Sequence, residues 1–326
     1  MKLHSLLGLG LLALASLSPL PAAAQSALER PAITSAKASH SLLLGVAYAG
    51  KRLVAVGDRG HILYSDDRGE HWQQATVPVS VMMTSVVFPT EKEGWAVGHQ
   101  GVILHSADAG ATWKVQHSDK NSSGDHLGTP MLGVWFANAK RGFVVGAYGS
   151  FLKTEDGGST WTDISSQISN PDGWHLNAIA GTADGQTLFL AGERGMIFRS
   201  RDAGASWQPL RSPFEGSFFG IAPLAHDLLL VYGLQGHMYR SNDEGASWQE
   251  VPTGVSSGLN AATMLNDGRV VVVGNAGVVL TSGDHGHNFF SQALPDRHSL
   301  TAAIATGNDD LLAVGEAGIQ LIQDKK

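Results

Sequence analysis

Short apolar runs recur along the chain at a nearly constant spacing, and each of them ends in a Gly-x-x-Gly element. Two adjacent apolar positions follow the second glycine in the first six elements, as in Ile62-Leu63 and Ile103-Leu104. Because neighbouring residues of a strand point to opposite faces, this pattern predicts strands that are covered on both sides. The first glycines of the elements are Gly57, Gly98, Gly146, Gly192, Gly233, Gly274 and Gly315, at intervals of 41, 48, 46, 41, 41 and 41 residues.

A period near 41 residues with this content is typical of one four-stranded antiparallel blade of a β-propeller. We therefore predict an all-β, seven-bladed propeller in a single domain. The second glycine of each element is expected at a tight turn between the second and third strands of its blade. A side chain there would obstruct a positive φ or a close approach of the backbone.

A second motif, Ser/Thr-x-Asp-x-Gly-x-Thr/Ser-Trp, begins five residues after the second glycine in the repeats and is the Asp-box or BNR motif. The Asp is expected to accept backbone N–H groups across a turn, and the aromatic residue to pack between blades. A Ca²⁺ loop built on Asp66-Asp67 or Glu155-Asp156 is the functional alternative, and it would need further oxygen ligands in one short turn. The predicted structural residues are Asp67, Trp72, Asp108, Trp113, Asp156, Trp161, Asp202, Trp207, Asp243, Trp248 and Asp284.

The N-terminus has the pattern of a secretory signal peptide. Lys2 precedes an apolar stretch from Leu6 to Leu20, and the small residues Ala22-Ala23-Ala24 follow. We expect cleavage after Ala24, so that residues 25–326 form the propeller and function in the periplasm of a Gram-negative bacterium or outside the cell. The chain contains no cysteine, which excludes a lipobox anchor, disulfides and thiolate metal sites.

The seventh repeat reaches Ile322 without an Asp-box or a fourth strand. In the 41-residue repeats the Trp lies 26 residues before the next first glycine, and the same count back from Gly57 reaches Pro31. The segment Pro31–Ser35 is therefore predicted to be the outer strand of the last blade, closing the ring and covering an edge that would otherwise be open.

The chain is acidic, with a formal net charge of −7; without Lys2, 21 basic and 29 acidic residues leave −8. This charge argues against a nucleic-acid partner, since no clustered basic footprint is present. We predict no cofactor and no metal. His285 and His287 are interpreted as a surface pair, because no third ligand is in view.

Two connections between blades are longer than the others, at residues 117–130 and 166–174. Strand alternation places both on the end of the ring that carries the Gly-x-x-Gly loops, opposite the Asp-boxes. Insertions on a repeat scaffold often mark the binding face, although they are also compatible with plain solvated loops. The candidate partner-binding residues on this face are Arg59, His99, Tyr148, Trp174, Arg194 and Gln235.

The signal peptide, the Asp-boxes in register and the consensus at Val97–Trp113 and Val145–Trp161 together resemble the photosystem II stability/assembly factor family of BNR-repeat propellers. The resemblance implies a non-enzymatic exported factor that holds membrane-protein subunits during assembly. It implies a basic contact patch in photosynthetic members, and Arg59 and Arg194 lie in the corresponding type of loop. The net acidic chain indicates a non-photosynthetic bacterial member, a monomer that would serve an envelope transporter component or another membrane complex.

Two alternatives remain open. A sialidase-like glycoside hydrolase would need paired carboxyl groups or a Tyr-Glu pair, and converging arginines; Arg199 and Arg240 precede Asp-box serines, where exposed positions are expected. A lectin-like propeller could stack a ligand on Tyr148, Trp174 and His99 near the central channel. The residues Ser122, Ser123, Asp125 and His126 include the letters of a triad, but no nucleophile elbow accompanies them.

Overall fold

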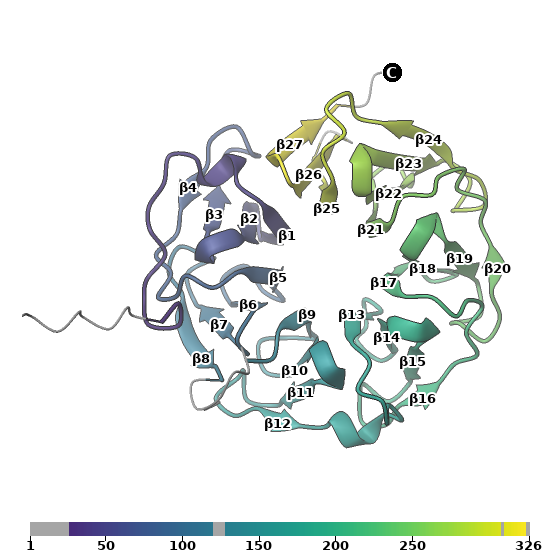
Figure 1. Ribbon diagram of the computed structural model, residues 1–326, viewed down its shortest axis with the longest axis horizontal. Coiled ribbons are helices and arrows are strands. Elements are labelled where there is room, and N and C mark those ends of the chain that lie inside the picture. Colours follow the sequence, from purple (N-terminus) through teal and green to yellow (C-terminus); the bar gives the residue numbers. More distant parts are fainter. Residues whose placement is uncertain (1–25, 120–127, 308–309, 324–326) are drawn as a thin grey trace, which may run out of the picture.

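The computed structural model describes residues 26–119, 128–307 and 310–323. The chain forms seven antiparallel sheets around a central axis, and each sheet is one blade (Figure 1). Within a blade the strands follow one another in sequence from the axis to the rim. The structure confirms the predicted all-β, seven-bladed propeller. The predicted signal peptide lies outside the described residues.

The first four blades have four strands each. They are β1 (Leu43–Ala49), β2 (Arg52–Gly57), β3 (Ile62–Ser65) and β4 (Gln73–Gln74); β5 (Met83–Val87), β6 (Gly94–Gly98), β7 (Ile103–Ser106) and β8 (Lys114–His117); β9 (Met131–Phe136), β10 (Gly142–Gly146), β11 (Phe151–Thr154) and β12 (Thr162–Asp163); and β13 (Leu176–Gly181), β14 (Leu188–Gly192), β15 (Ile197–Ser200) and β16 (Gln208–Pro209).

Blades 5 and 6 also have four strands, and blade 7 has three. They are β17 (Phe218–Ala225), β18 (Leu228–Gly233), β19 (Met238–Ser241) and β20 (Gln249–Glu250); β21 (Leu259–Met264), β22 (Val270–Gly274), β23 (Val278–Ser282) and β24 (Phe290–Ala293); and β25 (Leu300–Ala305), β26 (Leu311–Gly315) and β27 (Gly318–Ile322). Short 3-10 helices are η1 (Ala38–His40), η2 (Asp58–Gly60), η3 (Ala147–Gly149), η4 (Ser165–Gln167), η5 (Glu193–Gly195), η6 (Leu234–Gly236) and η7 (Asn275–Gly277). In the described part of the chain, no helix has both the length and the apolar character needed to cross a membrane.

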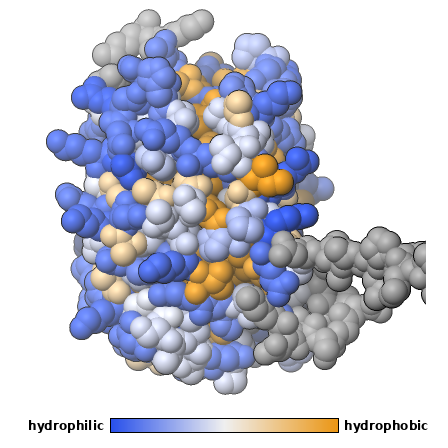
Figure 2. All heavy atoms as spheres, turned by 90° about the vertical axis from the view of Figure 1, so that its left-hand side faces the viewer, coloured by the Kyte–Doolittle hydropathy of each residue, from blue (hydrophilic) through white to orange (hydrophobic). Residues whose placement is uncertain are grey.

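The core lies between the blades, because each sheet packs on both of its neighbours. The second strand is the most deeply buried, and every residue of β6, β10, β14, β18, β22 and β26 is buried. The adjacent apolar positions of the third strand are buried as predicted, except for Leu152, which is half-buried. Figure 2 views the ring from the side of blades 1 and 2 and shows a mostly hydrophilic wall with smaller apolar patches.

The predicted role of the second glycine is confirmed. Gly60 has φ +73°, and a Cβ at this position would collide with the carbonyl oxygen of Val79, on the connection to the next blade. The same positive φ recurs in the other six elements, from Gly101 to Gly318. The turn therefore depends on glycine for its backbone conformation, and in blade 1 for the close passage of the neighbouring connection as well.

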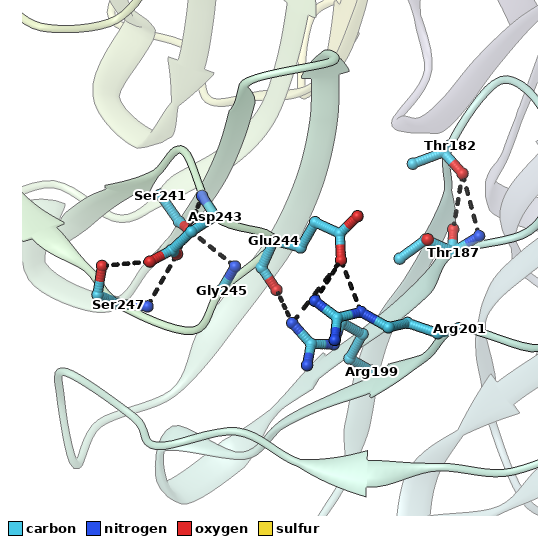
Figure 3. Close-up of polar contacts among 9 residues, drawn as sticks. All are labelled: Thr182, Thr187, Arg199, Arg201, Ser241, Asp243, Glu244, Gly245 and Ser247. Atoms are coloured by element: carbon cyan, nitrogen blue, oxygen red, sulfur yellow. Dashed lines mark hydrogen bonds and ion pairs between the residues drawn. The ribbon is translucent and has the colours of Figure 1, made fainter.

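The Asp-box hairpins have the predicted geometry, and Figure 3 shows the copy in blade 5. Asp243 Oδ1 accepts hydrogen bonds from Ser241 Oγ (2.7 Å) and from the N–H of Ser247 (2.9 Å), while Oδ2 accepts from Ser247 Oγ (2.6 Å). Gly245 donates its N–H to Ser241 Oγ (2.7 Å). These bonds occupy both carboxylate oxygens, so the aspartate is a structural residue of the turn.

The structure corrects the prediction of how the ring is closed. The sheet of blade 7 has three strands, and Pro31–Ser35 does not join it. Ala32 instead donates its N–H to the carbonyl oxygen of Val77 (3.1 Å), and Ala27 and Leu28 pack on the apolar cluster between blades 1 and 2. One physical reason is that Pro31 has no N–H to donate to a neighbouring strand. A second is that the apolar side chains of this segment are partly buried against the connection after β4.

Hydrogen bonds between inner strands join blade 7 to blade 1. Thr301 Oγ1 donates to the carbonyl oxygen of Leu43 (2.7 Å), and the Tyr48 hydroxyl donates to the carbonyl oxygen of Ala305 (2.9 Å). Thr301 is the bulged residue of β25, and bulged residues at the same place in other blades make the equivalent bond to the next blade. In these bonds, side chains donate to backbone carbonyl oxygens: Thr84 to Met131, Asn177 to Phe218 and Asn260 to Leu300.

Candidate binding surface

The Gly-x-x-Gly loops project from one end of the ring, and in the first six loops the second variable residue adopts a left-handed conformation. Arg59, Tyr148, Arg194 and Gln235 all occupy this position, with φ between 53° and 57°. This backbone turn leaves the side chain in solvent, and Tyr148 is 70% exposed. Four of the six candidate residues therefore share one structural role. His99 occupies the first variable position of its loop and is also exposed.

The second insertion places Trp174 beside the loop of blade 4. The side-chain amide of Asn170 closes the insertion, since Nδ2 donates to the carbonyl oxygen of Trp174 (2.8 Å) and Oδ1 accepts the Trp174 N–H (3.0 Å). The guanidinium of Arg194 lies over the Trp174 ring, 5.4 Å from its centroid. An arginine at this distance is attracted by the negative face of the indole. The pair is accessible to a partner, because Trp174 is 37% exposed to solvent.

His175 extends this cluster toward blade 3. Its ring packs edge-on against Tyr148, with 5.3 Å between centroids, and its backbone N–H donates to Glu193 Oε2 (2.8 Å). We name the group of Tyr148, Trp174, His175, Glu193 and Arg194 the aromatic cluster. It joins three of the six predicted site residues across the boundary of blades 3 and 4.

The other three candidates lie on the same face without joining the aromatic cluster. Arg59 forms an ion pair with its neighbour Asp58 (3.3 Å), and no contact within the described ranges links His99 or Gln235 to Trp174. Sequence reasoning missed His175 and the part played by Glu193. The position of His175 directly after Trp174, at the end of an insertion, was the available signal.

The first insertion is attached to the loop of blade 2 at both of its described ends. Thr129 donates its N–H to Asp119 Oδ2 (2.7 Å), and its carbonyl oxygen accepts the N–H of Gly101 (2.8 Å). Residues 120–127, which contain the serine, aspartate and histidine of the weak triad hypothesis, lie outside the described residues.

The prediction that Arg199 and Arg240 are exposed is wrong, because each is only 8% exposed. Arg199 donates from Nη1 to the carbonyl oxygen of Glu244 (2.8 Å), and Arg240 donates from Nε to that of His285 (3.0 Å). Both acceptors are left-handed residues of the Asp-box in the following blade. The third strand is covered on both faces, so its arginines connect neighbouring blades.

A cavity of about 410 Å³ opens at the Asp-box end between blades 4 and 5, lined in part by Phe189, Asp184 and Glu244. The Glu244 carboxylate is bound by Arg201, whose Nε lies 2.7 Å from Oε2 (Figure 3). Hydrogen bonds from the Thr182 hydroxyl and the Gln186 N–H lower the pKa of Asp184. A glycosidase needs one carboxylic acid with a raised pKa, and the hydrogen bonds of Asp184 favour its ionised form instead.

One group of described residues could hold a metal ion, but both carboxylate oxygens of its aspartate are already engaged. Among the described residues, Asp67, Glu70 and His71 bring three potential ligand atoms within 4.8 Å of one another. Both oxygens of Asp67 already accept hydrogen bonds from His71, through its N–H (2.9 Å) and Nδ1 (2.7 Å). These bonds and one from Ser65 lower the pKa of Asp67 to about 2. Asp66, the other residue of the calcium hypothesis, is bound by Arg52 through both oxygens.

Comparisons with known proteins complete this description. The family model described as photosynthesis system II assembly factor YCF48 matches residues 34–128 and 126–299. The chain belongs to this family. A comparison with curated proteins found no match.

Solved structures share the fold of this chain. A structure of YCF48 bound to D1 peptide has a TM-score of 0.69 at 16% identity, covering 87% of this chain and 94% of its own. YCF48 from Cyanidioschyzon merolae has a TM-score of 0.68 at 17% identity, covering 86% and 95%. The WD40 propeller domain of Doa1 is similarly close, with a TM-score of 0.68 at 11% identity, covering 92% and 97%.

Proposed function

We propose that this YCF48-family propeller is a non-enzymatic, exported assembly factor that binds a segment of a membrane protein through its Gly-x-x-Gly face. Family membership supports the assembly role, and a relative with the same fold has been solved with D1 peptide. The N-terminal pattern of Lys2, an apolar stretch and Ala22-Ala23-Ala24 supports export. The partner is a membrane-protein subunit or an envelope transporter component, bound by a monomer.

The aromatic cluster is the observation that carries this proposal. Tyr148 and Trp174 offer exposed rings on a rigid scaffold, and such residues provide binding energy at low cost in side-chain entropy. Arg194 forms no ion pair with a described residue, so its guanidinium is available to a carboxylate of the ligand. We therefore expect a peptide with an apolar side chain next to an acidic group.

Site-specific photocrosslinking in cells tests the proposal. A benzophenone amino acid replaces Tyr148 in one strain and Val115 in another. Val115 is the control, because it is also exposed (38%) but lies on β8 at the rim of blade 2. We expect position 148 alone to give a discrete adduct that mass spectrometry identifies as a membrane protein. Equal adducts from both positions, or adducts with soluble proteins only, would refute the proposal.

Binding to the captured partner then gives a quantitative check. Replacing Tyr148 and Trp174 together by Ala should weaken binding by at least about 2 kcal/mol, the size of a hot-spot effect. Val115→Ala should leave the affinity unchanged. Export is tested separately by cell fractionation and by the N-terminal sequence of the mature protein, which should begin at Gln25.

A further inference from the structure

Each Asp-box aromatic residue belongs to the apolar cluster that its blade shares with the preceding blade. The same cluster contains the residue three positions before the first glycine of the Gly-x-x-Gly element in the preceding blade. Trp207, for example, packs edge-on against Phe143, with 6.2 Å between ring centroids. Around the ring, the residues that share a cluster in this way are Trp72 and Leu312, Trp113 and Val54, Trp161 and Trp95, Trp207 and Phe143, Trp248 and Phe189, and Phe289 and Leu230.

The seventh position has no aromatic residue. Val271 occupies the corresponding place in blade 6, and its cluster with blade 7 contains only aliphatic residues from the described part of the chain. A pocket of about 370 Å³ opens to the surface here, with Val271, Val279, Leu311 and Ile322 on its apolar walls and Arg269 and Gln292 among its polar lining. A cavity of roughly 150 Å³ is enough for a benzene ring, so this pocket has room for an aromatic side chain.

The strand beside this cavity also lacks a neighbour. β27 pairs with β26, and no described strand lies along its other edge (Figure 1). Leu321 on this strand is 52% exposed. In the other six blades a fourth strand pairs at this place, as β8 does with β7. An open edge of this kind is a template for an added strand.

A shift in register makes the edge polar as well as open. In blade 1, Val56 pairs with Ile62, two residues after the second glycine; in blade 7, Val314 pairs with Ile319, only one residue after it. Gln320 therefore takes the place that an aliphatic residue holds in blade 1. Its Nε2 donates to Asp296 (2.7 Å), but its Oε1 is buried without a donor among the described residues.

We propose that this unfilled place in blade 7 binds an extended segment of a partner protein, which pairs with β27 and puts an aromatic side chain into the cavity. The described N-terminal residues 26–35 lie against blade 1 and contain no aromatic residue, so they do not supply it. Strand addition at an exposed sheet edge is an established mode of peptide recognition, with backbone pairing for affinity and a pocket for specificity. This second site goes beyond the proposed Gly-x-x-Gly face.

The protein's own Asp-box supplies the probe. A fluorescein-labelled peptide with the sequence of residues 109–119 contains Trp113 and the outer strand β8, and its control carries Ala in place of Trp113. Fluorescence anisotropy with the mature protein should show the Trp peptide binding at least about tenfold more tightly than the Ala peptide. Equal affinities, or no binding of the Trp peptide at about 1 mM, would overturn the proposal.

Two variants that fill the cavity locate the binding. Val271→Trp should reduce the affinity for the Trp peptide by at least about tenfold. Thr281→Trp fills the same space from a half-buried wall position and keeps the test decisive if Val271→Trp fails to fold. Loss of binding on Tyr148→Ala with retention in both cavity variants would place the peptide on the other face and refute this site. That pattern leaves the proposed function intact.

Two further outcomes would assign the place to this chain itself. Light scattering that shows a dimer, dissociated by Val271→Trp, would identify a second copy as the occupant. Tighter peptide binding after deletion of residues 26–36 would identify the N-terminal segment as a competitor. Either result would overturn the proposal that another protein occupies this place. A protein that stays monomeric, and whose affinity for the Trp peptide is unchanged by the deletion, would support the proposal.

Discussion

Two Asp-box tryptophans at the same place in different blades differ in a single hydrogen bond. Trp113 in blade 2 and Trp207 in blade 4 are 4% and 8% exposed. Trp113 Nε1 donates to the carbonyl oxygen of Gly110 (2.9 Å). Trp207 Nε1 is buried and finds no acceptor in the described part of the chain. Replacing each by Phe therefore removes a satisfied donor in one case and an unsatisfied donor in the other.

The magnitudes follow from this difference. Both substitutions remove a similar part of a buried ring, which costs about 1–2 kcal/mol of unfolding free energy. Trp113→Phe also loses a hydrogen bond and leaves the Gly110 carbonyl without that donor, at a further cost of about 1–2 kcal/mol. Trp207→Phe removes a desolvated N–H, which returns about 1–2 kcal/mol. We expect Trp113→Phe to destabilise by about 2–4 kcal/mol and Trp207→Phe by about 1 kcal/mol or less.

Thermal and urea unfolding followed by circular dichroism measure the difference. For a propeller of about 300 residues, about 2 kcal/mol corresponds to a difference in Tm of roughly 3 °C. Trp248→Phe is a second control, because the Nε1 of Trp248 is also buried without a described acceptor, and it should behave as Trp207→Phe. Equal losses at positions 113 and 207, or a larger loss at 207, would refute the hydrogen-bond argument.

Three other predictions concern acid stability, the N-terminal segment and ring closure. Hydrogen bonds from the hydroxyl and N–H of Ser206 lower the pKa of Asp202 to about 2, so its stabilising effect is complete above the unfolded pKa and is lost as the pH falls through about 2. The Tm should therefore drop between about pH 4 and 2, less steeply in Asp202→Asn, and parallel profiles would contradict this. Deleting residues 26–36 uncovers Val77 and should lower the Tm and increase binding of a hydrophobic dye, whereas an unchanged melt would show that the segment is dispensable. Thr301→Val removes the bond from blade 7 to Leu43 and should cost about 1–2 kcal/mol, measured as a shift in the urea midpoint that Thr84→Val should reproduce at the next equivalent junction.

The repeat pattern was sufficient to predict the number of blades and the two turn types, because their determinants are local. The Asp-box depends on bonds between residues two and four positions apart, as between Ser241, Asp243 and Gly245. The left-handed glycine of each loop is likewise specified by its own position in the repeat. Features of this kind are visible in the order of the residues alone, since no distant part of the chain is needed to form them.

Only the tertiary structure decided the features that depend on contacts between blades. The burial of Arg199 rests on a carbonyl of the next blade, and the pairing of Trp174 with Arg194 rests on the path of an insertion. The N-terminal segment packs on blade 1 and not on blade 7, because its apolar residues are partly buried there and because Pro31 disfavours a strand. The spacing of motifs along the chain shows which sites a segment is long enough to reach. Which of those sites buries the segment depends on the surfaces that the assembled blades expose.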